Sequence, residues 1–122
     1  IAQGTPLWNR EISGDKGMTL LRKYLYLTDA NGSVIVLDKT SGGAMWKNDQ
    51  LFMRDTTAPA VLKDFVVVGD NEGYLHGLSR EDGNYAARIK LDGGAIKAAP
   101  IQLDDGLLVQ TRSGGLYSLS VH

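Results

Sequence analysis

The sequence predicts an all-β protein made of propeller blades, in which each blade is a sheet of four antiparallel strands. One pattern recurs at an interval of 41 residues, which places three glycines and three leucines in phase: Gly32, Gly73, Gly114, Leu37, Leu78 and Leu119. Short apolar and β-branched runs alternate with glycine-containing turns, and no stretch of about ten residues has a convincing helical period. A period of about 40 to 45 residues is typical of propeller blades.

The middle repeat contains four strand candidates, at residues 58–62, 65–70, 74–79 and 85–91. The second of them reads FVVVGD, a continuous apolar run that suits a strand covered on both faces. Residues 71–73 form a predicted hairpin turn in which Gly73 supplies a positive φ angle. Because Gly32 and Gly114 lie in phase with Gly73, we expect the three glycines to behave alike.

The repeat also divides the chain into parts of one propeller domain. These parts are an outer strand of a preceding blade at residues 6–12, a blade at about 18–49, a second blade at about 58–91 and an incomplete last blade at about 98–120. Closed propellers have typically about four to eight blades. We therefore expect the chain to be the C-terminal part of a longer propeller, whose other terminus supplies the strand that the last blade lacks.

The bulk composition excludes several classes of function. The formal net charge is −1, whereas phosphate binding needs a basic surface, so we expect no nucleic-acid partner. No apolar run approaches the roughly 18 residues of a transmembrane helix. Cysteine is absent, which excludes disulfides, thiolate metal ligands and a cysteine nucleophile within this sequence.

Two acidic residues, Asp29 and Asp70, recur in phase just before the hairpin turns. Such acids typically cap a turn by accepting hydrogen bonds from backbone N–H groups. A metal site needs carboxylates that converge, whereas the repeat distributes these two over different blades. His76 lies within an apolar strand, and we expect it to be packed or hydrogen-bonded. The sequence therefore predicts no catalytic residue, no metal site and no cofactor.

The segment LFMRDTT, residues 51–57, connects two predicted blades and is the candidate for partner contact. Loops on a rigid β scaffold often carry binding residues, and aromatic, Met and Arg side chains are enriched at interfaces. The candidate contact residues are Phe52, Met53, Arg54 and Asp55. The alternative is that the two apolar side chains pack beneath the blade while the two charged ones are solvated.

Two motifs carry a resemblance to known proteins. LDKTSGGAMW, residues 37–46, resembles the quinoprotein-type propeller repeat, in which an Asp, a Thr-Gly or Ser-Gly turn and a Trp recur in each blade. Trp8 and Trp46 carry the Trp, but Ala87 stands at the next position in phase, so we expect that seam to be packed less tightly. The stretches VVVGDNEGYLHGLSREDG and LLVQTRSGGLYSLS are similar to the last blades of the BamB family.

The BamB family consists of lipoproteins of the outer-membrane β-barrel assembly machinery of Gram-negative bacteria. The resemblance implies a non-enzymatic scaffold with an eight-bladed propeller, tethered at the periplasmic face of the outer membrane by a lipid on a cysteine upstream of this chain. It also implies two kinds of partner, the barrel-inserting subunit BamA and nascent outer-membrane proteins. Two other functions remain open, namely a quinoprotein-type dehydrogenase with a quinone and a calcium ion at the propeller axis, and a generic periplasmic ligand-binding propeller.

The isolated chain is further expected to associate with itself. The strand at residues 116–119 has an unpaired edge, and exposed edges invite strand addition. Residues 7–12 are a spare strand of the fourth-strand type. We expect this strand of one copy to pair near residues 116–119 of another copy, or the exposed blade faces of two copies to stack.

Overall fold

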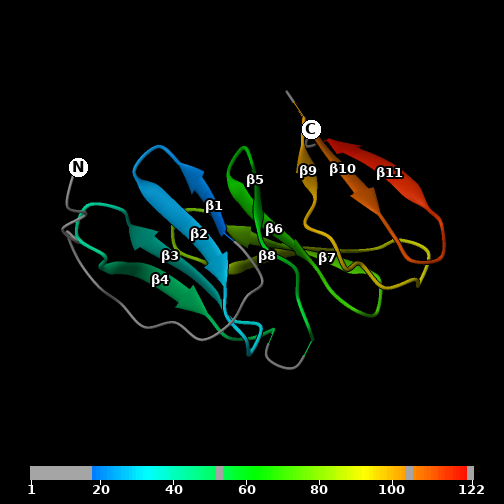
Figure 1. Ribbon diagram of the computed structural model, residues 1–122, viewed down its shortest axis with the longest axis horizontal. Coiled ribbons are helices and arrows are strands. Elements are labelled where there is room, and N and C mark those ends of the chain that lie inside the picture. The colour runs from blue at the N-terminus through cyan, green and yellow to red at the C-terminus, as the bar shows by residue number, and fades with distance from the viewer. Residues whose placement is uncertain (1–17, 52–53, 104–105, 121–122) are drawn as a thin grey trace, which may run out of the picture.

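The computed structural model describes residues 18–51, 54–103 and 106–120, and the regular elements within these ranges are all β-strands. They form three antiparallel sheets in which strands that follow one another along the chain are neighbours. Figure 1 shows the sheets side by side in chain order. The all-β architecture with four-stranded antiparallel blades is therefore confirmed. The predicted strand at residues 6–12 lies outside the described residues.

We name the sheets the first, second and third blades. The first blade consists of β1 (Met18–Leu21), β2 (Tyr24–Thr28), β3 (Val34–Asp38) and β4 (Ala44–Asn48). The second blade consists of β5 (Ala60–Leu62), β6 (Phe65–Gly69), β7 (Tyr74–Ser79) and β8 (Tyr85–Lys90). The third blade consists of β9 (Ile101–Gln102), β10 (Gly106–Gln110) and β11 (Leu116–Ser120).

The sequence period is also a period of backbone geometry. Gly32, Gly73 and Gly114 have φ angles of 91°, 89° and 100° in the hairpin turns between the second and third strands of their blades. The shift in strand register between Val36 and Leu37 recurs 41 residues later, between Gly77 and Leu78. Each of the first two blades therefore has a β-bulge at the same place in its outer strand pair.

Apolar side chains from facing strands fill the space between neighbouring blades. The first and second blades share one core cluster, formed by Tyr26, Val34, Val36, Leu51, Val61, Val66, Val68 and Leu78. The second and third blades share another, formed by Ala60, Leu62, Val67, Leu75, Ile96, Leu107 and Val109. Burying one such large apolar side chain contributes about 1.5–3 kcal/mol. The middle strands read as continuous apolar runs because both of their faces are buried in this way.

Trp46 contacts the second blade through a hydrogen bond and through packing of its ring. Its indole Nε1 donates a hydrogen bond to the carbonyl oxygen of Arg80 at 3.0 Å, and its ring lies so close to Gly83 that a Cβ atom at that position would overlap it. Ala87 occupies the in-phase position in the second blade. There a cavity of about 240 Å³ opens toward the third blade, lined by Gly77, Ala87 and several leucines. The looser packing that the change from Trp to Ala predicts for the second seam stays a prediction, because a groove of about 640 Å³ also lies beside Trp46 at the first seam.

Candidate functional site

The candidate site lies where the β6–β7 turn of the second blade meets the loop that arrives from the first blade. The turn itself is organised by a side-chain oxygen. Asp70 Oδ1 accepts hydrogen bonds from the N–H groups of Glu72 at 2.9 Å and Tyr74 at 3.0 Å. These bonds hold the hairpin turn closed at its two ends.

Equivalent oxygens organise the corresponding turns of the other two blades. Asp29 Oδ1 accepts from the N–H groups of Asn31 and Ser33, each at 3.0 Å. In the third blade Thr111 stands in phase, and its Oγ1 accepts from the N–H of Gly115 at 3.1 Å. The Thr111 hydroxyl also donates to Asp92 Oδ2 at 2.7 Å, and this hydrogen bond is the main cause of an Asp92 pKa of about 2.

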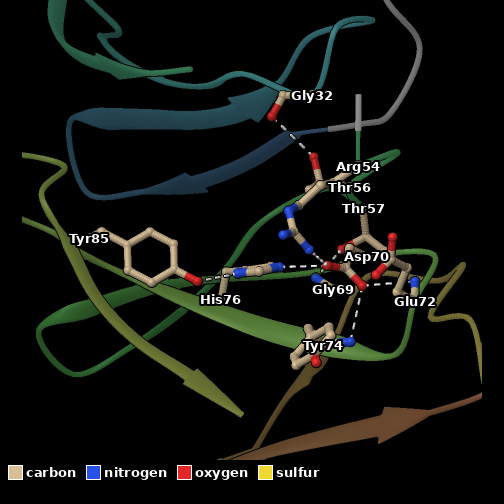
Figure 2. Close-up of polar contacts among 10 residues, drawn as sticks. All are labelled: Gly32, Arg54, Thr56, Thr57, Gly69, Asp70, Glu72, Tyr74, His76 and Tyr85. Atoms are coloured by element: carbon tan, nitrogen blue, oxygen red, sulfur yellow. Dashed lines mark hydrogen bonds and ion pairs between the residues drawn. The ribbon is translucent and has the colours of Figure 1, made fainter. Parts of the chain in front are cut away.

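Asp70 differs from its in-phase counterparts because its second oxygen is engaged as well. His76 Nε2 lies 2.6 Å from Asp70 Oδ2, and Arg54 Nη1 lies 3.1 Å from the same atom. On its other side, His76 Nδ1 lies 2.5 Å from the hydroxyl of Tyr85. Figure 2 shows these side chains converging from the connecting loop, the turn, β7 and β8. We call Arg54, Asp70, His76 and Tyr85 the Asp70 network.

The members of the Asp70 network differ in their access to solvent. The side chain of Asp70 is 0% exposed and that of His76 is 1% exposed, whereas that of Arg54 is 33% exposed. In the first blade, Ile35 and Ala44 occupy the positions in phase with His76 and Tyr85. The network is therefore a feature of the second blade and not of the repeat.

Hydrogen bonds determine the charge state of Asp70, and burial determines that of His76. Burial alone would raise the pKa of Asp70, but hydrogen bonds from His76, the backbone of Tyr74 and Glu72, and Arg54 hold that pKa below its ordinary value. Desolvation lowers the pKa of His76, and the positive charges of Arg54 and Arg88 act in the same direction against the opposing effect of Asp70. We therefore assign His76 as neutral, with Nε2–H donating to Asp70 and Nδ1 accepting from the Tyr85 hydroxyl.

The loop that carries Arg54 is joined to both blades. The Thr56 hydroxyl donates to the carbonyl of Gly32 in the first blade at 3.2 Å. The Thr57 hydroxyl oxygen accepts from the N–H of Gly69 in the second blade at 3.1 Å. The N–H of Asn71 donates to the carbonyl of Arg54 at 3.2 Å. The described part of this loop, Arg54 onward, is thus held in place by both blades.

The structure separates the charged residues of the predicted contact loop. Arg54 turns toward Asp70, while Asp55 forms an ion pair with Lys97 at 2.9 Å from the next connecting loop. Both side chains of that second pair are more than 40% exposed, at 42% and 43%. Phe52 and Met53 lie outside the described residues. Sequence reasoning singled out Arg54 and Asp70 separately but not their contact, and it missed Tyr85.

A second concave region lies at the other end of β7. This groove of about 640 Å³ is lined by aromatic and charged side chains, including Tyr24, Met45, Trp46, Arg80 and Glu81. Arg80 Nε donates to the Tyr26 hydroxyl at 3.0 Å, and its carbonyl accepts from Trp46. Since the lining residues Tyr26, Trp46 and Arg80 already hold the seam together, we assign this groove to blade packing.

In residues 18–51, 54–103 and 106–120, no group of three or more His, Cys, Asp or Glu side chains is placed to hold a metal ion. The imidazole of His76 is buried and lies between Asp70 and Tyr85, so these hydrogen bonds fix its orientation. The same described ranges contain no helix able to cross a membrane.

Comparison with known proteins identifies the family. A family model described as "Outer membrane protein assembly factor BamB" matches residues 1–48 and, in an overlapping second match, residues 30–122. The protein of that name from Bordetella pertussis is 42% identical over 115 residues, which cover 94% of this chain and 30% of the relative. The protein of the same name from Escherichia coli K12 is 32% identical over 120 residues, which cover 98% of this chain and 31% of the relative.

Solved structures agree in fold. The crystal structure of BamB from Moraxella catarrhalis matches with a TM-score of 0.87 and 23% identity, over 98% of this chain and 36% of that one. A quinohemoprotein alcohol dehydrogenase from Pseudomonas putida HK5 matches with a TM-score of 0.73 and 19% identity, over 91% of this chain and 19% of that one. The chain thus spans about a third of the relatives' length or less. Because the family model covers the sequence from end to end, the chain belongs to the BamB family of outer membrane protein assembly factors.

Proposed function

We propose that this chain is part of a non-enzymatic scaffold subunit of the outer-membrane β-barrel assembly complex. In this role it binds a BamA-like barrel-inserting subunit and aids the delivery and insertion of nascent outer-membrane proteins. The observation that carries the proposal is the family match over the whole chain, at up to 42% identity with a named assembly factor. The Asp70 network supports a scaffold role, because its polar side chains form hydrogen bonds with one another.

The contact surface proposed for the partner is the loop face around Arg54, Asp55 and Lys97. Loops on a rigid β scaffold commonly carry binding function. The Asp55–Lys97 pair is exposed on this face, and its two charges are available for exchange with a partner's charges. An exposed pair of this kind contributes little to stability, so it can be changed without unfolding the blades.

The test is binding of the intact protein to the barrel-inserting subunit, measured by biolayer interferometry. Lys97→Glu and Asp55→Arg each place two like charges together and shift the charge of the loop face by two units, in opposite directions, and we expect each to weaken binding about tenfold. Arg54→Glu is a poorer probe, because it would place a second carboxylate against buried Asp70. Glu81→Lys, in the turn after β7, is the matched control at the opposite end of the blade. Unchanged affinity in both loop variants would remove this face from the proposal.

The proposed location is the periplasmic face of the outer membrane, with a lipid anchor outside this chain. The support is the name of the relatives, which are outer membrane protein assembly factors. Membrane fractionation of cells that produce the protein, followed by a carbonate wash, tests this location. Recovery in the inner-membrane fraction would contradict it.

A quinoprotein-type dehydrogenase is the second candidate function. It is favoured by the structural match to the quinohemoprotein alcohol dehydrogenase, which at 19% identity concerns the fold alone. Calorimetric titration of the intact protein with a quinone cofactor in the presence of calcium separates the two functions. Saturable binding at micromolar concentration would favour the enzyme over the scaffold.

A further inference from the structure

Two donors share one oxygen atom in the Asp70 network. Asp70 Oδ2 accepts from His76 Nε2 at 2.6 Å and from Arg54 Nη1 at 3.1 Å. We infer that protonation of His76 displaces Arg54 from Asp70 into solvent, so that the network is a proton-sensitive switch for the position of this arginine. The inference concerns the network alone and does not rest on the proposed partner.

The charges explain why protonation changes the balance. With neutral His76, the buried carboxylate of Asp70 is matched by the one positive charge of Arg54. Protonation adds a second positive charge at hydrogen-bond distance from the same oxygen, and charges interact strongly where water is excluded. One carboxylate then faces two cations, and the weaker of the two contacts is expected to break.

Geometry determines which cation leaves. His76 is 1% exposed and is held between Asp70 and the Tyr85 hydroxyl, so it cannot move away without opening the β7–β8 pair. A hydroxyl both donates and accepts, so Tyr85 can keep its contact with a protonated ring by rotating its proton. Arg54 has the longer contact and is already 33% exposed. Its side chain can therefore reach water without any change in the strands.

The charged groups around His76, apart from Asp70, oppose its protonation. From β8, His76 is influenced by Arg88 and bonded to Tyr85; on its own strand the ring of Tyr74 lies at 6.1 Å between centroids. Arg88 and Lys90 both lie over that Tyr74 ring, at 4.9 Å and 5.7 Å from its centroid. Asp70 is the negative charge acting on His76 among these groups, while Arg54 and Arg88 oppose its protonation. The switch is accordingly set to operate below the ordinary pKa of histidine.

Protonation of His76 and formation of the Arg54–Asp70 pair are thermodynamically linked. If protonation of His76 weakens the Arg54–Asp70 pair, then removal of Arg54 must favour protonation of His76 by the same factor. Each whole unit by which the pKa of His76 rises on loss of Arg54 corresponds to a tenfold weakening of the pair by the proton.

Nuclear magnetic resonance of the intact protein, labelled with ¹³C-histidine and ¹⁵N-arginine, tests the switch from about pH 7.5 to about pH 4. We expect the Arg54 Nε signal to change along the same curve as the His76 ring carbons. Arg54→Gln should raise the pKa of His76. Lys97→Gln removes a cation of the same loop face that pairs with Asp55 instead, and it should leave that pKa unchanged.

The His76→Gln variant provides a further check. Its amide can still donate to Asp70 and accept from Tyr85 but cannot be protonated in this range. The Arg54 signal should then be independent of pH over the range in which His76 titrates in the parent protein. An Arg54 signal that stays constant while His76 titrates in the parent protein would overturn the inference, as would equal His76 pKa values with and without Arg54.

Discussion

Trp46 of the first blade lies directly on Gly83 of the second, so the first seam joins an indole ring to a residue that has no side chain. Gly83 also has a φ angle of 77°, which other residues rarely adopt. The seam therefore depends on glycine for two independent reasons, space and backbone conformation.

Replacement of Gly83 should be costly for both reasons. Gly83→Ala adds left-handed backbone strain and a methyl group that overlaps Trp46, and we expect a loss of about 3 kcal/mol in the free energy of unfolding. Gly93→Ala is the matched control, because Gly93 has a φ angle of 86° but no atom of the described part of the chain within 4 Å of the position that a Cβ atom would take. It should cost about 1 kcal/mol from strain alone. Urea denaturation measures both losses. An equal loss of unfolding free energy in the two variants would show that the contact with Trp46 adds nothing to the cost of backbone strain.

The three in-phase turn glycines should not be equivalent, although the repeat predicts that they are. A Cβ atom on Gly73 would lie 2.9 Å from the carbonyl oxygen of Gly94, and one on Gly32 would lie 2.9 Å from that of Leu51. Among the described residues, nothing lies within 4 Å of that position at Gly114. We expect Gly114→Ala to lose about 1 kcal/mol and the other two alanine variants about 2 kcal/mol or more. Thermal melts of the three variants, compared at one pH, decide this ranking.

Stability should fall in mild acid because of His76. Its pKa in the folded protein is lowered below the ordinary value of about 6.5, so the unfolded chain binds more protons near that pH. The contribution of neutral His76 is complete above about pH 6.5 and is lost as the pH falls through the folded-state pKa, with a slope of at most about 1.4 kcal/mol per pH unit. Asp70, whose folded-state pKa is also lowered, acts only at more acidic pH.

Urea unfolding at a series of pH values checks this dependence. His76→Gln should flatten the curve just below about pH 6.5 while leaving the loss at stronger acid in place. If His76→Gln keeps the full dependence of stability on pH just below about pH 6.5, that dependence comes from another group.

The open second seam offers a site for stabilisation. Ala87 lines the cavity of about 240 Å³ that faces the third blade. Ala87→Met places a flexible apolar side chain there, and we expect a gain of about 0.5–1 kcal/mol in the free energy of unfolding. Ala86→Met is the control, since Ala86 is exposed like Ala87 but does not line the cavity. A gain that is the same for both variants would reflect strand propensity and not cavity filling.

The isolated 122-residue chain should self-associate through β11. This edge strand carries no charged residue, and its Leu116 is 66% exposed, whereas the outer strands β4 and β8 carry Lys47, Arg88 and Lys90. Charged side chains on an edge strand oppose strand addition. Light scattering at high micromolar concentration should show association that Leu116→Lys reduces and Met45→Lys, on β4, does not. A monomeric mass for the unaltered chain would remove this expectation.

The repeat was predictable because it depends on local chemistry. Turn glycines, turn-capping acids and apolar runs can be recognised directly in the sequence, and together they delimit the strands. In the third blade, Thr111 stands at the position of Asp29 and Asp70, and it too accepts a backbone hydrogen bond through a side-chain oxygen. The left-handed conformations of Arg22 and Lys63, with φ angles of 57° and 53°, could not be predicted from the letters, because neither residue is glycine.

The Asp70 network could not be predicted in the same way. Its contacts depend on which face of β7 each side chain occupies and on the strand register that brings β8 alongside. The register shift at Gly77 places Tyr85 opposite Leu78, and from there its hydroxyl reaches His76. Position in the repeat gives no guide, because Ile35 and Ala44 stand at the equivalent places in the first blade. One signal was present, namely a histidine within an apolar strand six residues after a turn acid.

The β-bulge that recurs between Val36 and Leu37 and between Gly77 and Leu78 has a consequence for how such a chain can lengthen or shorten. Since the bulge of the first blade returns in the second after 41 residues, a window of that length that runs from the first blade into the second contains one bulge wherever it begins. A duplication or deletion of 41 codons can therefore break the gene inside a strand as readily as between blades and still restore strand pairing on either side. Ancestral breakpoints in this lineage need not coincide with blade boundaries.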